Sequence, residues 1–325
     1  MRNILLIIKN NLYRLTKMKI MLVMIIVVLP IIIYGGIYFS KADNIKGKIA
    51  IVNATSTQEE AMKKSTEGND NITFEFLSKE PAKTDLIKGI YIAEINFEGT
   101  EPKVISYGNK EIKKQLEASL RGEVYESDVE VTTIEGRIIG FLIMFLFMGS
   151  IMAMEFFLTD RENGTYVRVL SSNVSYYEYI IGQIAYLVCT LTVPTLIISL
   201  IMLKVLSIQL NMTIGLFSLL ILIIGLLSSS FSALVCTLCK DKVSATMSGS
   251  AITMITCLLG GCIINIVDNN KIVEALRNLI PQKRLIDLAN SYNNEDLIFI
   301  IVVIIVFTSI SIVLGKRQYE NGDFV

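Results

Sequence analysis

The sequence predicts a mainly α-helical membrane protein with six transmembrane helices, an N-terminal interfacial helix and an extracellular α/β insertion between the first two spans. The first observation behind this prediction is composition: 52% of the residues are apolar and 18% are charged, whereas about a quarter are charged in soluble domains. The second is segment length, because a helix needs roughly 20 apolar residues to cross the hydrocarbon core. Six segments reach that length: Ile20–Phe39, Ile138–Phe157, Tyr179–Leu203, Leu216–Leu238, Val243–Ile266 and Leu297–Leu314.

Residues 1–19 are predicted to form an amphipathic helix at the membrane interface. Apolar residues recur there at the spacing of one helical face, and the basic residues lie elsewhere on the helix. The apolar face comprises Ile4, Leu5, Ile8, Leu12 and Leu15. A helix of this length is marginal on its own, so the alternative is a basic flank that merely extends the first span.

Residues 20–40 form the first predicted span. Ser40, Lys41 and Ala42 resemble a signal-peptide cleavage site, but the apolar run exceeds the 7–15 residues typical of a signal peptide. We therefore expect an uncleaved span. Only basic charges precede it, and the first acidic residue is Asp43. By the positive-inside rule the N-terminus is then cytoplasmic, and six spans return the C-terminus to the same side.

Residues 41–137 are polar and are expected to form a small extracellular α/β domain. Short β-rich runs alternate with helix-like pieces, which is typical of such a domain. The β-rich runs are Lys48–Val52, Ile72–Leu77, Ile90–Phe97 and Lys103–Tyr107. The helix-like pieces are Gln58–Ser65, Pro81–Lys88 and Asn109–Arg121.

Residues 138–325 form the predicted five-span membrane domain. Two prolines, Pro30 in the first span and Pro194 in the third, each remove a backbone hydrogen bond and are hinge candidates. The Gly260–Gly261 pair in the fifth span is a third candidate. The alternative for all of these residues is tolerated packing within a helix bundle.

The residues that are missing exclude several functions. The chain has no histidine, which removes histidine-based acid–base catalysis and histidine zinc sites. It has no P-loop phosphate motif, and the predicted spans have no ionisable interior residue of the kind that ion-coupled carriers use. Its net charge of zero argues against nucleic-acid binding. The five cysteines lie in apolar runs and are expected to be packing residues, so we predict no catalytic residue and no metal site.

A charged segment, residues 158–178, connects the second and third predicted spans on the cytoplasmic side. It also carries Val167, Val169 and Leu170, which a simple connecting loop at the membrane surface would not need. The segment is therefore predicted to dock a cytoplasmic protein. The candidate coupling residues are Asp160, Arg161, Glu162, Gly164, Thr165, Arg168 and Leu170. For each of them the alternative is a solvated loop charge, a helix cap or, at Gly164, a residue that permits a positive φ.

This segment resembles the coupling segment of ABC-2 type permeases, the membrane subunits of ATP-binding-cassette exporters. The matching residues are Asp160-Arg161-Glu162-Asn163-Gly164-Thr165, then Arg168 and Leu170, then Tyr179 and Gly182. The order of elements along nearly the whole chain is similar too, including the strand Lys48–Asn53 after the first span and Pro281 in the last outer loop. Two positions differ, because Asn173-Val174 replaces the usual proline and Gln183 replaces the usual lysine.

The resemblance implies a pathway formed by two permease subunits, identical or related, and a separate ABC ATPase that binds the coupling segment. The chain itself would bind no cofactor, and ATP and Mg²⁺ would act through the ATPase. We expect contacts with membrane lipids and none with nucleic acid. The permease resemblance implies the bacterial cytoplasmic membrane as the expected location. The abundance of isoleucine, lysine and asparagine is typical of an AT-rich bacterial genome.

The predicted function is export of an amphiphilic, drug-like or peptide or toxin substrate, driven by the partner ATPase. The alternative is a membrane-anchored sensor or scaffold whose extracellular domain binds a ligand. An ion-coupled carrier is disfavoured by the uncharged spans, and a membrane enzyme by the missing pair of nucleophile and base.

Overall fold

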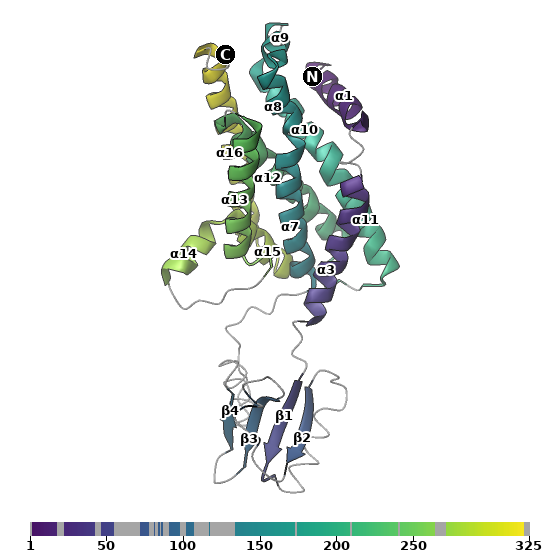
Figure 1. Cartoon of the computed structure of the whole chain (residues 1–325), viewed down its shortest axis with the longest axis vertical. Helices are drawn as coiled ribbons and strands as arrows, with labels where there is room; N and C mark the ends of the chain where they lie inside the picture. Colours follow the sequence, from purple (N-terminus) through teal and green to yellow (C-terminus); the bar gives the residue numbers. More distant parts are fainter. Residues whose placement is uncertain are drawn as a thin grey trace. The chain divides into compact units, whose positions relative to one another are not determined.

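Figure 1 presents a computed structural model that is mainly helical and divides into two compact units. One unit comprises Met1–Ser40 and Thr132–Val325, and the other comprises Lys41–Val131. The structure describes residues 2–17, 23–42, 47–54, 72–77, 91–97, 102–106, 134–172, 174–208, 210–239, 241–263 and 271–321, and the single positions 81, 84, 86 and 117.

Five helical segments among the described residues are long and apolar enough to cross a membrane. Together they make the chain a multi-pass membrane protein, and they correspond to the last five predicted spans. They are α7 (Ile134–Ala153) with α8 (Glu155–Glu162), α10 (Tyr176–Leu187) with η2 (Val188–Thr192) and α11 (Val193–Val205), α12 (Ile214–Leu238), α13 (Lys242–Leu259) and α16 (Asn294–Asn321).

The segment predicted as the first span contains a shorter apolar helix in the described residues. It comprises the π-helical turn η1 (Met24–Val28) and α3 (Leu29–Ala42), and its apolar part is Ile25–Tyr38. Residues 18–22 lie outside the described residues. A sixth span therefore stays a prediction.

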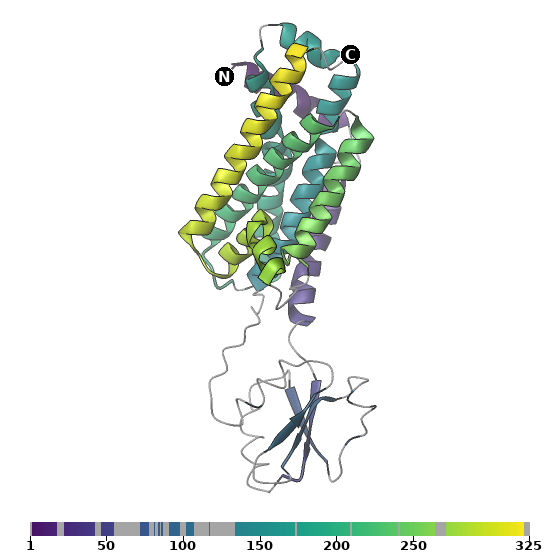
Figure 2. The ribbon, with the colours of Figure 1, turned by 90° about the vertical axis from the view of Figure 1, so that its left-hand side faces the viewer.

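Helix α12 is the centre of the helical unit, as Figures 1 and 2 show. In its most apolar stretch 78% of the residues are buried, compared with 11% in α16. It packs against α7, α16 and α10, and Phe231 joins these layers because its ring centroid lies 5.4 Å from that of Phe147 and 6.0 Å from that of Phe307. Most of the α16 surface is left to face lipid or another chain.

Side-chain caps fix where two of the spans begin. The Thr213 hydroxyl accepts from the backbone N–H of Leu216 at the start of α12. The Asp241 carboxylate accepts from the backbone N–H of Ser244 at 2.8 Å and from its hydroxyl. These bonds stabilise the charged carboxylate and lower the pKa of Asp241. Capping residues therefore set these helix boundaries.

The chain between α13 and α16 differs from the outer loop that the sequence predicted. Helix α13 ends at Leu259 rather than Ile266, because Gly261 adopts φ +80°, a conformation that ends an α-helix. Two helices follow, α14 (Lys271–Leu279) and α15 (Pro281–Asn290), and Pro281 stands in the first turn of α15, where its missing N–H costs nothing. Helix α15 packs against α7 and α16.

A π-helical turn precedes both predicted hinge prolines. Pro30 follows η1, and Pro194 follows η2. Proline has no N–H and crowds the carbonyl four residues earlier. The α-helical hydrogen-bond pattern is therefore replaced by a π-helical turn before each proline. Gly260 caps α13, and Gly261 follows it. Hinge motion at these residues stays a prediction.

The second unit contains a four-stranded sheet in the order β2-β1-β3-β4. The strands are β1 (Gly47–Val52), β2 (Ile72–Leu77), β3 (Tyr91–Asn96) and β4 (Lys103–Ile105). Strand β1 is parallel to β2 and β3, and β4 is antiparallel to β3. Successive β1 residues Ile49, Ala50, Ile51 and Val52 are all buried, as in a strand covered on both faces. The predicted pieces Gln58–Ser65, Pro81–Lys88 and Asn109–Arg121 lie outside the described residues, apart from isolated positions.

Candidate functional site

The segment predicted to dock a partner is built from two short helices. Helix α8 continues α7 and ends at Glu162, and α9 (Thr165–Ser171) follows after a turn at Gly164. Gly164 has φ +66°, and a Cβ placed there would meet nothing within 4 Å. The turn therefore needs glycine for its backbone conformation rather than for space. Ser175 and Glu178 then form a capping box that starts α10.

Asp160 ties this segment to the N-terminal helix α1 (Arg2–Lys17). An Arg14 nitrogen lies 2.7 Å from an Asp160 carboxylate oxygen, and the Arg14 guanidinium also lies 4.4 Å from the ring centroid of Phe156. Both charged side chains are largely buried, so the pair is screened less than a surface ion pair. One acidic residue of the predicted set thus serves as an anchor.

Helix α1 packs along α10, as its position in Figure 1 suggests. The Asn11 amide donates to the Gln183 side-chain oxygen at 2.8 Å in a buried contact. A Cβ added to Gly182 would lie 3.0 Å from Ile7 atoms, so the small residue permits the close approach. Gln183 stands where a lysine is usual in the family that the coupling segment resembles. It is a neutral hydrogen-bond partner for Asn11 in the interface between α1 and α10.

Arg161 is buried beneath the segment, with 8% of its surface exposed. Its guanidinium donates to the carbonyl oxygens of Cys236 at 3.1 Å and Cys239 at 2.8 Å. These carbonyls belong to the C-terminal end of α12, where the helix dipole attracts a cation. The arginine therefore connects the segment directly to the central helix.

The inner face of α9 rests on an aromatic cluster formed by Phe157, Tyr166, Tyr176, Tyr179 and Tyr319. Tyr166 has no exposed surface, and its ring centroid lies 5.2 to 6.2 Å from those of the other four. Burial raises the pKa of the Tyr166 hydroxyl, so the residue stays neutral. Leu170 is also buried. Because Tyr319 belongs to α16, the cluster joins α9 to the last helix.

Glu162, Val167 and Arg168 form the outer face of the segment. All three are exposed. The Glu162 carboxylate accepts from the backbone N–H of Lys242 at 3.3 Å, so it also caps the start of α13. Arg168 makes no side-chain hydrogen bond or ion pair with any residue in the described part of the chain. This surface offers a cation and an apolar side chain to a partner.

Thr165 lies between the two faces and lines a pocket of about 240 Å³. The pocket is enclosed by α1, α8, α9 and α10. Its other lining residues are Ile7, Asn10, Asn11, Arg14, Asp160, Val169, Tyr179 and Gln183. The described residues contain no group of three histidine, cysteine, aspartate or glutamate side chains that could hold a metal ion.

The seven predicted coupling residues thus have different positions. Asp160, Arg161 and Leu170 contact the bundle, whereas Glu162 and Arg168 are exposed. Gly164 forms the turn between the two short helices, and Thr165 lines the pocket. Sequence reasoning missed the anchoring roles of Arg14 and Tyr166. Neither role has a local signal in the sequence. Arg14 is one of several basic residues near the N-terminus, and its partner lies 146 positions away. Tyr166 packs on Tyr319, which belongs to the last helix.

Comparison with known families gives a match across most of the chain. The family described as ABC-2 family transporter protein matches residues 19–315, which include all five candidate spans except the last residues of α16. A comparison with curated proteins found no match.

Proposed function

The chain belongs to the ABC-2 family of transporter proteins, and we propose that it is the membrane-spanning permease subunit of an ATP-driven exporter. Proteins of this family are transmembrane transporter components and are not themselves catalytic. A separate ABC ATPase would bind ATP and Mg²⁺ and drive the cycle. The proposed docking surface for that ATPase is the outer face of the segment at residues 158–178.

The observation that carries this proposal is the division of the segment into an anchored face and an outward face. Arg161 joins it to α12, Asp160 joins it to α1, and Tyr166 joins it to α16. A force applied to Val167 or Arg168 would therefore reach three helices at once. A rigid connection of this kind is what coupling to a moving partner requires.

The proposed membrane arrangement places six spans in the bacterial cytoplasmic membrane, with α3 as part of the first. Both termini would be cytoplasmic, and residues 41–137 would be extracellular. Two contacts support termini on one side, because Asn3 near the N-terminus bonds to Glu178 and Tyr319 near the C-terminus packs on Tyr166. Exposed Leu5 and Leu6 support an interfacial position for α1.

The proposed substrate is amphiphilic, drug-like or a peptide or toxin, and a second permease chain, identical or related, would complete the pathway. The described spans carry few charges in their interiors, which suits an apolar or amphiphilic cargo. The exposed face of α16 supplies apolar surface for a neighbouring chain or for lipid.

The test is a mild-detergent purification of this chain from its native cells, followed by an ATPase assay on the proteins that co-purify. The Arg168→Glu variant reverses the exposed charge of the docking surface, and Arg317→Glu is the matched control, because Arg317 is an exposed arginine of α16. We expect a P-loop ATPase with the wild type and the control, and a loss of its association or activity with Arg168→Glu.

Equal recovery of the ATPase with Arg168→Glu and with the wild type would contradict docking at this surface. Recovery of no ATPase, under conditions that keep other membrane complexes intact, would contradict the permease proposal itself. It would favour a membrane-anchored sensor or scaffold.

A further inference from the structure

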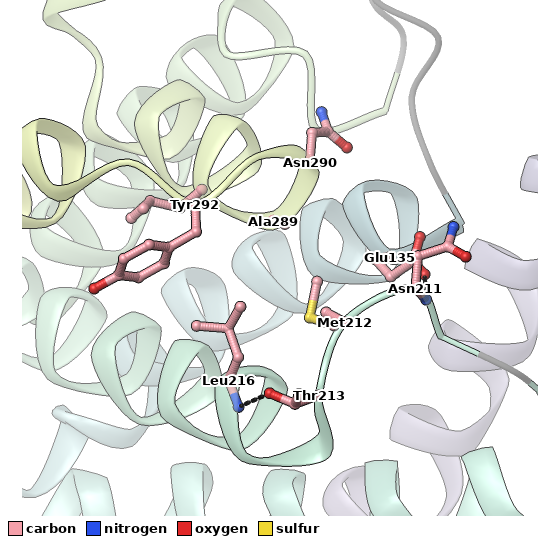
Figure 3. A pocket seen from close by; sticks show the side chains of 9 residues that line it. Glu135, Asn211, Met212, Thr213, Leu216, Ala289, Asn290 and Tyr292 are labelled. Atoms are coloured by element: carbon pink, nitrogen blue, oxygen red, sulfur yellow. Dashed lines mark hydrogen bonds between the residues drawn. The ribbon is translucent and has the colours of Figure 1, made fainter.

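A second pocket lies at the other end of the spans from the coupling segment, where α7 and α12 begin and α15 ends. Figure 3 shows its lining residues. Its volume is about 320 Å³, at the small end of the roughly 300–1,000 Å³ found for ligand pockets. The lining residues are Glu135, Asn211, Met212, Thr213, Leu216, Leu288, Ala289, Asn290 and Tyr292.

Glu135 is the only acidic residue among these, and it is 98% buried, with 2% of its surface exposed. Its Oε1 accepts a hydrogen bond from the backbone N–H of Asn211. Its Oε2 is buried and has no hydrogen-bond partner among the residues that the structure describes. A buried carboxylate normally has partners for both oxygens, because removing the charge from water is costly. The position in the first turn of α7 offsets only part of that cost.

The described cations of α7 and α15 have other partners. Arg137, two residues along α7, donates to the carbonyl oxygen of Ile263. On α15, the Nη1 atom of Arg284 lies 2.6 Å from Oδ1 of Asp296. The Nζ atom of Lys283 lies 3.7 Å from Oδ2 of Asp287. None of these pairs includes Glu135, so its Oε2 stays without a hydrogen-bond partner in the described part of the chain.

We propose that this pocket binds the ammonium group of an amphiphile, with Glu135 as the counter-ion. A cationic N–H donor would complete the hydrogen bonding of Oε2 and neutralise the carboxylate. Met212, Leu216 and Leu288 supply apolar surface for the first carbons of the attached chain. The site is a property of this chain alone and does not depend on the proposed ATPase partner.

A divalent cation fits the pocket less well than an ammonium group. Calcium takes six to eight oxygen ligands, usually from several carboxylates, and Glu135 is the only carboxylate among the lining residues. A neutral amphiphile fits less well too, because it would leave the buried charge uncompensated. The chemistry of the site therefore favours a primary ammonium on an apolar chain, carried by a lipid head group or by a soluble amphiphile.

The test measures binding of 6,6,6-trifluorohexylammonium to the purified full chain in neutral maltoside micelles by fluorine NMR. Glu135→Gln removes the charge but keeps an oxygen that can accept from Asn211. We expect its affinity to be at least tenfold weaker than that of the wild type. Glu274→Gln, which neutralises an exposed glutamate of α14, is the matched control and is expected to bind like the wild type.

Three further measurements keep the test decisive. Tyr292→Ala removes an exposed aromatic side chain that lines the pocket and is expected to weaken binding of the ammonium probe several-fold. This variant tests the pocket independently of whether Glu135→Gln folds. The neutral probe 6,6,6-trifluorohexanol is expected to bind the wild type and Glu135→Gln equally. Competition by a short-chain phosphatidylethanolamine would show that the site accepts a lipid head group, and absence of competition would exclude that head group as the ligand.

Equal affinity of the ammonium probe for the wild type and Glu135→Gln would overturn the proposal. So would binding of the neutral probe that is as tight as that of the ammonium probe.

Discussion

The two ends of the α7–α8 helix hold their charges in different ways. At the α8 end, Asp160 and Arg161 each have a close partner on another helix. At the α7 end, Glu135 is more deeply buried than either, yet only one of its oxygens has a partner among the described residues. The paired charges fasten a segment to the bundle, whereas the incompletely paired charge lines a pocket. Burial alone therefore does not distinguish these roles, whereas the number of charged atoms that have a hydrogen-bond or ion-pair partner does.

The largest expected effect that tests this difference is at Arg161. Arg161→Met removes two hydrogen bonds from a charged donor and leaves the carbonyls of Cys236 and Cys239 without that donor. We expect a loss of about 3 kcal/mol in the free energy of unfolding, measured by thermal melting of the purified chain. Arg168→Met, at an exposed arginine of the same segment, is the control and should melt like the wild type. Equal melting of the two variants would break the comparison.

The next effect concerns the turn between the two short helices. Gly164→Val forces a β-branched residue into φ +66°, which we expect to cost about 2 kcal/mol in stability. Gly164→Asn should cost less, because asparagine tolerates the left-handed conformation. Melting curves of the two variants test this order. Similar losses would indicate that the turn needs glycine for another reason.

A smaller effect is expected for the ion pair between α1 and α8. A double-mutant cycle with Arg14→Ala and Asp160→Ala should give a coupling energy of about 1 kcal/mol, since both side chains are mostly shielded from solvent. Chemical or thermal unfolding of the four proteins provides the measurement. A coupling energy near zero would mean that the pair does not hold α1 in place.

The smallest effect on stability is expected at the other end of the helix. Glu135→Gln keeps the acceptor for Asn211 and removes an incompletely paired buried charge, so its stability should stay within about 0.5 kcal/mol of the wild type or rise. Thermal melting without added ligand tests this. A loss as large as that of Arg161→Met would show that the carboxylate is structural, and the contrast between the two ends would disappear.

Some of the fold could be predicted from sequence because the responsible signal is local. A run of about 20 apolar residues leaves few alternatives to a membrane helix, and the predicted β-rich runs overlap β1 to β4. The α14–α15 pair could not be predicted in this way. Its charged residues, such as Arg277 and Lys283, are typical of a loop. Packing of Leu285 and Leu288 against the bundle accounts for α15.

The candidate site was predictable in position but not in detail. The charged pattern at residues 160–170 marked the segment, yet the separation of inward Arg161 from outward Arg168 depends on helix positions fixed by distant contacts. Glu135 was assigned to the polar domain because the apolar run begins at Ile138. The structure starts α7 at Ile134, which places Glu135 and Arg137 in the helix and buries both.

The central claim is that the outer face of the coupling segment binds an ATPase, and site-specific photo-crosslinking tests it most directly. A photoreactive amino acid would replace Val167 on that face and, as a control, Ile298 on the exposed surface of α16. The account predicts a covalent adduct between a P-loop ATPase and the chain carrying the probe at position 167, and no such adduct from position 298. An ATPase that co-purifies with the chain but never crosslinks at position 167 would contradict it.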